Sequence, residues 1–212
     1  MFPNATIPER IADGTVHAVG VIGAITGTIM LLLWAAGAVS AGGMVALAID
    51  GCALIPTFAA SAIYNMMPYD APRPMLRRLD HAAIYLKIAG TYTPLVVMIG
   101  TWFAYVILAI VWALAIICMT LKLFFWRKPG RFGSALYLIM GWLSVGLIWA
   151  MIPAVPATAI WLIAAGGFLY TAGVPIYAAK SMPFSTAIWH VFVVVASGCF
   201  FAAIAIGAQV LT

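Results

Sequence analysis

Charged side chains are scarce in this sequence. Of its 212 residues only 7% are charged and 66% are hydrophobic, whereas a soluble domain has roughly 25% charged residues. A soluble fold could not bury so much apolar surface, so the composition excludes a soluble enzyme or binding domain. The sequence also lacks an internal repeat, which argues against a transporter built from two repeated halves.

Cysteine and histidine are scarce as well. Cys52, Cys118 and Cys199 are odd in number and far apart, each within an apolar segment. This pattern excludes a disulfide framework and a CxxC metal site. The three histidines are too few for a cytochrome with two haems, which would need four axial histidines, although one haem between two histidines stays possible.

Long apolar segments are abundant instead. A helix of about 20 apolar residues spans the hydrocarbon core of a bilayer, so the sequence predicts an all-α membrane protein with seven transmembrane helices in a single domain, residues 1–212. The residues before the first span carry Glu9, Arg10 and Asp13 and lack the positive region of a secretory signal. We expect spans at Val16 to Val39, Gly42 to Met67, Asp80 to Gly100, Trp102 to Phe125, Gly133 to Ile152, Pro156 to Ala179 and Phe184 to Leu211.

Basic residues fall almost entirely on one side of these spans. All but one of the ten are Arg10, Arg73, Arg77, Arg78, Lys122, Arg127, Lys128, Arg131 and Lys180. The positive-inside rule therefore predicts a cytoplasmic N-terminus and a C-terminus outside. Topology explains the net charge of +5, so we expect membrane lipids as partners and no nucleic acid.

The tenth basic residue, Lys87, lies inside the third span. It shares one helical face with Asp80 and Thr91, because seven and eleven residues are each close to a whole number of 3.6-residue turns. The second span carries a comparable stripe at Asp50, Thr57, Ser61 and Asn65, and the seventh carries one at Thr186, His190 and Ser197. Ionisable groups facing lipid are costly, so the three stripes are expected to face one another, with Lys87 balanced by Asp50 or Asp80.

Simpler explanations exist for each residue alone. Asp80 could cap its helix and pair with Arg77 or Arg78, and Lys87 could extend toward the inner headgroups. His190 could be an ordinary interior histidine. The functional hypothesis rests on the coincidence of depth and face on three helices.

The motifs themselves resemble a known family. LDHAAIYLKIAGTYTP in the third span, SAIYN in the second, IWHVFVVVASG in the seventh and PERIADGTVHAVG at the start are similar to the hemolysin III family. That family is the bacterial branch of the progestin and adipoQ receptors, which include the adiponectin receptors and are related more distantly to alkaline ceramidases. The resemblance therefore implies a multi-pass protein of the inner membrane of a bacterium. Glu9 and His17 occupy the usual places of the opening motif.

The resemblance implies a zinc site between spans two, three and seven. Its ligands would be a histidine four residues after the span-two serine and two histidines four apart in span seven, with the span-three aspartate holding a zinc-bound water. This is the layout of a metal-assisted amide or ester hydrolase. Ser61 and Asp80 match as candidate catalytic residues, and His190 matches as a metal ligand.

Two ligand positions depart from the family pattern. Asn65 and Thr186 stand where the other two histidines would be, and Phe200 replaces a further histidine common in bacterial members. An amide and a hydroxyl are poor zinc ligands, so we expect weak or partial zinc binding and at most residual hydrolase activity. His17 and His81 could form a different site, with His81 the weaker candidate because it lies about 100° around the helix from Asp80.

Three function classes follow. We favour a family member that acts in membrane lipid homeostasis with a degenerate zinc site. The alternative is a non-catalytic receptor, regulator or channel-like protein whose polar interior binds a lipid headgroup or an ion. A retinal protein is disfavoured because the seventh span has no lysine for a Schiff base.

Overall fold

The computed structural model describes residues 6–125, 132–179 and 181–212. For residues 132–135 it describes the backbone only. Its described residues are helical with no strand, which confirms the all-α membrane class. Six helices are long and apolar enough to cross a membrane, and a shorter apolar stretch covers Leu136–Met151. The long ones are α1 (Ile7–Ala35), α2 (Ala41–Met66), α3 (Arg73–Ile99), α4 (Trp102–Thr120, continued by the π-helix η1, Leu121–Phe125), α7 (Ala157–Ala178) and α8 (Ser185–Gly207, continued by the 3-10 helix η3, Ala208–Leu211).

Helix ends do not coincide with the ends of the apolar segments. Helix α1 begins nine residues before the expected Val16, because Thr6 and Glu9 form a capping box there. Helix α3 begins at Arg73, seven residues before Asp80, and ends at Ile99, followed by Gly100, whose φ of 67° suits glycine. Hydropathy marks where a helix enters lipid, whereas caps decide where it starts.

The fifth span is interrupted. In place of one helix over 133–152, α5 (Phe132–Trp142) passes into the 3-10 helix η2 (Leu143–Leu147) and then into the short α6 (Ile148–Met151). The Tyr92 hydroxyl donates to the carbonyls of Met140 and Gly141, at 2.9 and 3.0 Å, and Ser144 Oγ donates to the Gly141 carbonyl at 2.8 Å. These side chains compete with the regular helical hydrogen bonds where the helix tightens.

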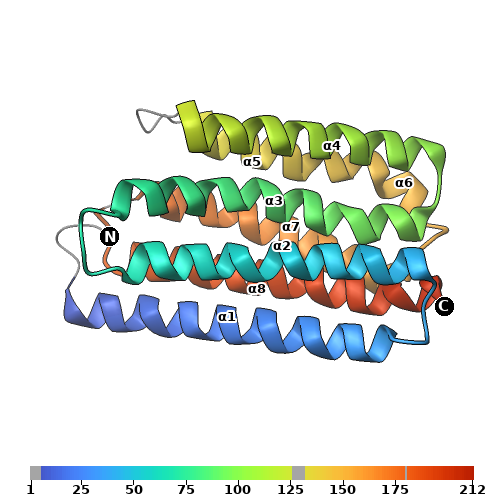
Figure 1. Cartoon of the computed structure of the whole chain (residues 1–212), viewed down its shortest axis with the longest axis horizontal. Coiled ribbons are helices and arrows are strands. Elements are labelled where there is room, and N and C mark those ends of the chain that lie inside the picture. The colour runs from blue at the N-terminus through green and yellow to red at the C-terminus, as the bar shows by residue number, and fades with distance from the viewer. Residues whose placement is uncertain (1–5, 126–131, 180) are drawn as a thin grey trace.

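Helix α3 is the centre of the bundle. In its most apolar stretch of 18 residues, 72% is buried, against 22–50% in the corresponding stretches of the other long helices. It packs against α2, α4, α5 and α8, while α1 lies against α2 and α8 (Figure 1). The first and last helices of the chain are therefore neighbours.

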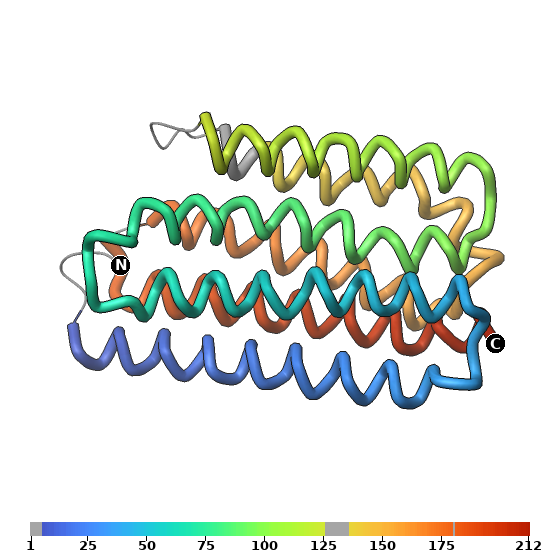
Figure 2. Tube along the Cα trace, viewed as in Figure 1, coloured from blue at the N-terminus to red at the C-terminus, as the bar shows by residue number. Residues whose placement is uncertain are grey.

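The helices alternate in direction, as the trace in Figure 2 shows. This alternation gathers Arg10, Arg73, Arg77, Arg78 and Lys122 at one end of the bundle, which we call the basic end. The other expected members, Arg127, Lys128, Arg131 and Lys180, lie outside the described residues. The chain ends at the opposite end, beside the α1–α2 connection, where the Ser40 amide donates to the Leu211 carbonyl at 2.9 Å.

Candidate metal centre at the basic end

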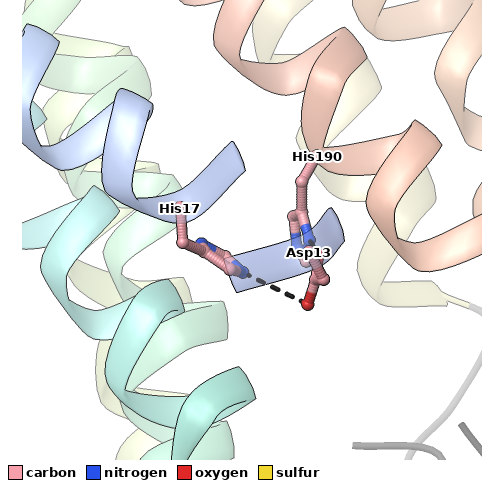
Figure 3. Close-up of side chains that lie close together, drawn as sticks. All are labelled: Asp13, His17 and His190. Atoms are coloured by element: carbon pink, nitrogen blue, oxygen red, sulfur yellow. Dashed lines mark hydrogen bonds and ion pairs between the residues drawn. The ribbon is translucent and has the colours of Figure 1, made fainter. Parts of the chain in front are cut away.

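Three buried side chains from the first and last helices converge near the basic end (Figure 3). Asp13 and His17 are one turn apart on α1, and His190 comes from α8. Asp13 Oδ1 lies 2.6 Å from His190 Nδ1, and Asp13 Oδ2 lies 3.6 Å from His17 Nε2. The centroids of the two imidazole rings are 4.3 Å apart. One potential ligand atom from each residue falls within 4.8 Å of the others, so this group, the Asp13 cluster, could hold a metal ion.

The donor chemistry of the Asp13 cluster suits a cation. Two imidazoles and one carboxylate form a ligand set known from catalytic zinc sites. The His17 Nε2 atom is buried, and its contact with Asp13 Oδ2, at 3.6 Å, is longer than a hydrogen bond. The residues therefore fit a bound divalent metal.

Helix α3 brings Asp80 to the same place. Its carboxylate interacts electrostatically with His190 and His17 and is a hydrogen-bond partner of the Ser61 hydroxyl. On its other side, Asp80 Oδ2 lies 3.6 Å from His81 Nδ1. Asp80 is thus placed beside the Asp13 cluster, where a carboxylate can accept a proton.

The positions that depart from the family pattern are close by. Asn65 is buried, and its Nδ2 donates to the Ser61 carbonyl at 2.9 Å and to Ser61 Oγ at 3.4 Å. It supports Ser61, which in turn contacts Asp80. Thr186 is half-buried in the first turn of α8, one turn before His190.

Sequence reasoning brought forward His190, Asp80 and Ser61 but missed Asp13 altogether. His17 was considered only as part of a different site. The signal was present, because Glu9, Asp13 and His17 repeat every four residues and so share one face of α1. The first span is expected to begin at Val16, which places Asp13 in the segment before the membrane.

A second polar group lies deeper in the bundle. The Lys87 ammonium donates to Tyr170 OH on α7 and to Ser197 Oγ on α8, and those two oxygens are 2.7 Å apart. The Phe58 and Tyr170 rings lie 5.2 and 4.9 Å from the ammonium nitrogen. We call Lys87, Tyr170 and Ser197 the lysine layer. It lies about 10 Å from the Asp80 level, at 1.5 Å per residue of α3.

The expected ion pair of Lys87 is corrected by these contacts. Within the described part of the chain, no carboxylate lies within 4 Å of its ammonium. Asp50 attracts Lys87 through space but accepts its hydrogen bond from Thr91 Oγ1, at 3.1 Å. Lys87 does face the interior as expected, since hydroxyl groups and aromatic faces supply its partners.

Comparison with known proteins agrees with the motifs. The model of the family described as "Haemolysin-III related" matches residues 6–201. The chain is similar to a "Hemolysin-3 homolog" of Bacillus subtilis (strain 168), with 33% identity over 198 residues, covering 92% of both chains. It is also similar to a "Hemolysin-3" of Bacillus cereus, with 33% identity over 196 residues, covering 92% of this chain and 90% of the relative. The chain is therefore a multi-pass membrane protein that belongs to the haemolysin-III-related family.

Proposed function

We propose that the protein acts in lipid homeostasis of a bacterial inner membrane, as a metal-dependent hydrolase of an amide or ester bond in a membrane lipid. The observation that carries the proposal is the convergence of Asp13, His17 and His190 beside Asp80. Asp13 and His17 would replace the two histidines that Asn65 and Thr186 displaced. The expectation of weak zinc binding, which considered only spans two, three and seven, is revised accordingly.

The depth of the Asp13 cluster suits a lipid linkage. Asp13 comes three residues before Val16, the expected entry of α1 into lipid, which is about 4–5 Å along the helix axis. The headgroup region of each leaflet is roughly 5–7 Å thick. Because lipid amide and ester bonds lie where headgroups meet acyl chains, the cluster is near the level of those bonds.

Each side chain has a task in this proposal. His17 Nε2 and His190 would hold the metal, and the Asp13 carboxylate would offset its charge. A bound zinc ion supplies a water that ionises near neutral pH. The Asp80 carboxylate, oriented by the Ser61 hydroxyl, would accept the proton of the attacking water and return it to the leaving group.

Metal analysis of the full-length protein in detergent tests this proposal. After exposure to zinc and removal of excess, we expect about one zinc per chain in the unaltered protein and far less in the His17→Ala variant. Thr15→Ala is the matched control, because Thr15 lies between Asp13 and His17 in sequence but is exposed. Loss of zinc should abolish release of fatty acid from a mixture of ceramides and phospholipids followed by mass spectrometry. Absence of zinc from the unaltered protein would contradict the proposal.

The second candidate is a non-catalytic receptor or regulator. The lysine layer favours it, because an ammonium held inside the bundle by hydroxyl groups has no task in hydrolysis. A protein that holds zinc stoichiometrically but turns over no lipid in the same assay would favour this candidate.

A further inference from the structure

We infer that Glu9 is a positioning residue that holds α1 and α8 in the register required by the Asp13 cluster. This inference rests on the proposed function, because it concerns the spacing of the proposed metal ligands. It assigns a role to a carboxylate that is not itself among those ligands.

Glu9 uses both of its carboxylate oxygens. Oε2 accepts hydrogen bonds from the backbone N–H of Thr6 at 2.7 Å and from Thr6 Oγ1 at 2.9 Å, which caps α1. Oε1 accepts a hydrogen bond from the backbone N–H of Phe184, at 2.9 Å. A single side chain therefore caps the first helix and fastens it to the residue that precedes the last.

Phe184 has an unusual backbone conformation. Its φ of 57° makes it the only described non-glycine residue in the left-handed region, which is unfavourable for an aromatic residue and persists only when its surroundings hold it there. Phe184 is the residue immediately before α8, and its own side chain does not cap the helix. The Glu9 carboxylate, supplied by α1, therefore fixes the point at which α8 starts.

The remaining contacts between α1 and α8 lie farther along the two helices and are apolar. A Cβ on Gly20 would come within 3.2 Å of Val194, and one on Gly27 within 3.1 Å of Phe201, so the helices pack closely there but no polar group joins them. The side-chain hydrogen bonds that join the two helices in the described residues are Glu9 to Phe184 and Asp13 to His190.

The position of Glu9 connects this fastening to the metal ligands. Glu9, Asp13 and His17 follow one another at intervals of one turn on α1, while Phe184 and His190 are six residues apart at the start of α8. If α1 shifted by one residue against α8, Asp13 and His17 would move about 1.5 Å relative to His190. Metal sites tolerate errors of only about 0.2 Å in ligand distance. The hydrogen bond between Glu9 and Phe184, which fixes the position of α1 along α8, therefore controls the affinity of the Asp13 cluster for a metal.

Three variants of the full-length protein separate the two tasks of Glu9. Glu9→Ala removes both the cap and the bond to Phe184. Glu9→Gln retains one acceptor oxygen for Phe184 but presents an amide to Thr6. Thr6→Val removes the Thr6 hydroxyl and leaves Glu9 free to bind Phe184.

Zinc affinity by chelator competition is the first measurement. We expect Glu9→Ala to weaken binding by about 10- to 100-fold, the usual effect of losing a group that orients metal ligands. Glu9→Gln and Thr6→Val should stay within about threefold of the unaltered protein. With cobalt as the probe, the visible band of a tetrahedral site should weaken in Glu9→Ala alone. Equal losses in Thr6→Val and Glu9→Ala would overturn the inference, because capping of α1 would then account for the effect.

Hydrogen exchange without metal provides an independent measurement. Deuterium uptake in the peptide that contains Phe184 should rise in Glu9→Ala and stay unchanged in Thr6→Val. Unchanged uptake in Glu9→Ala overturns the positioning role even if zinc binding falls. Failure of the unaltered protein to bind zinc would instead remove the proposed function, so the two failures can be distinguished.

Discussion

The Asp13 cluster and the lysine layer are built on some of the same helices, yet their chemistry is opposite. His190 and Ser197 are seven residues apart on α8, just as Asp80 and Lys87 are on α3. Near the basic end, the polar groups are carboxylates and imidazoles, whose lone pairs can bind a cation. Deeper in the bundle, one ammonium donates to two hydroxyl groups.

This difference shows how to distinguish a binding site from an internal polar contact. The lysine layer is already satisfied, because Tyr170 and Ser197 accept from Lys87 and Ser197 Oγ in turn donates to the Val193 carbonyl at 2.5 Å. The Asp13 cluster contains an imidazole nitrogen without a hydrogen bond in the described structure. A buried imidazole nitrogen held only by a long ionic contact therefore distinguishes the Asp13 cluster from the lysine layer.

The topology test has the largest expected effect, because a periplasm-dependent reporter is either active or inactive. Fused after Thr212, such a reporter should be active, and inserted between Asp70 and Arg77 it should be inactive. This result would place the Asp13 cluster nearer the cytoplasm than the lysine layer. The opposite pattern of activity would reverse their order.

Removal of a metal ligand should have the next largest effect. His190→Ala is expected to weaken zinc binding by more than about 100-fold, since even groups outside the ligand set cost roughly 10- to 100-fold. Lys87→Met should leave zinc affinity within about threefold, as the lysine layer lies about two turns away. Chelator competition measures both variants, and a comparable loss in Lys87→Met would show that the two groups form one site.

Substitutions in the lysine layer should change the free energy of unfolding. Combining Tyr170→Phe with Ser197→Ala removes both hydroxyl acceptors and should lower the free energy of unfolding by about 3 kcal/mol, since hydrogen bonds to charged groups contribute roughly 1.5–3 kcal/mol each. Adding Lys87→Met should recover more than half of this loss, because the buried ammonium that lacks acceptors in the double variant is then removed. Unfolding in mixed detergent measures the free energies, and a triple variant no more stable than the double would refute the assignment.

A smaller effect is expected where α2 and α3 approach each other. A Cβ at Gly90 would lie 2.4 Å from the Ala53 Cβ, so Gly90→Ala should destabilise the protein by about 1–3 kcal/mol through overpacking. Gly23→Ala is the matched control, since nothing lies within 4 Å of its added carbon. Equal stabilities would show that the close helix contact beside Asp50 and Thr91 can relax.

The sequence predicted the fold in most respects. Hydropathy indicated seven spans, and the periodicity of polar residues correctly placed Lys87 and Thr91 toward the interior. The break in the fifth span could not be foreseen, because Tyr92, which contributes to it, is about 50 residues away along the chain. Asp13 and the Glu9 contact with Phe184 were missed for a similar reason, since both depend on α1 lying against α8.

That adjacency of α1 and α8 has a consequence for biosynthesis. Asp13 and His17 are synthesised before the intervening helices, whereas His190 belongs to α8, which follows them. The Asp13 cluster therefore cannot assemble before α8 is made. A polypeptide cut off before α8 carries only two of its three side chains, so it lacks the imidazole that completes the candidate site.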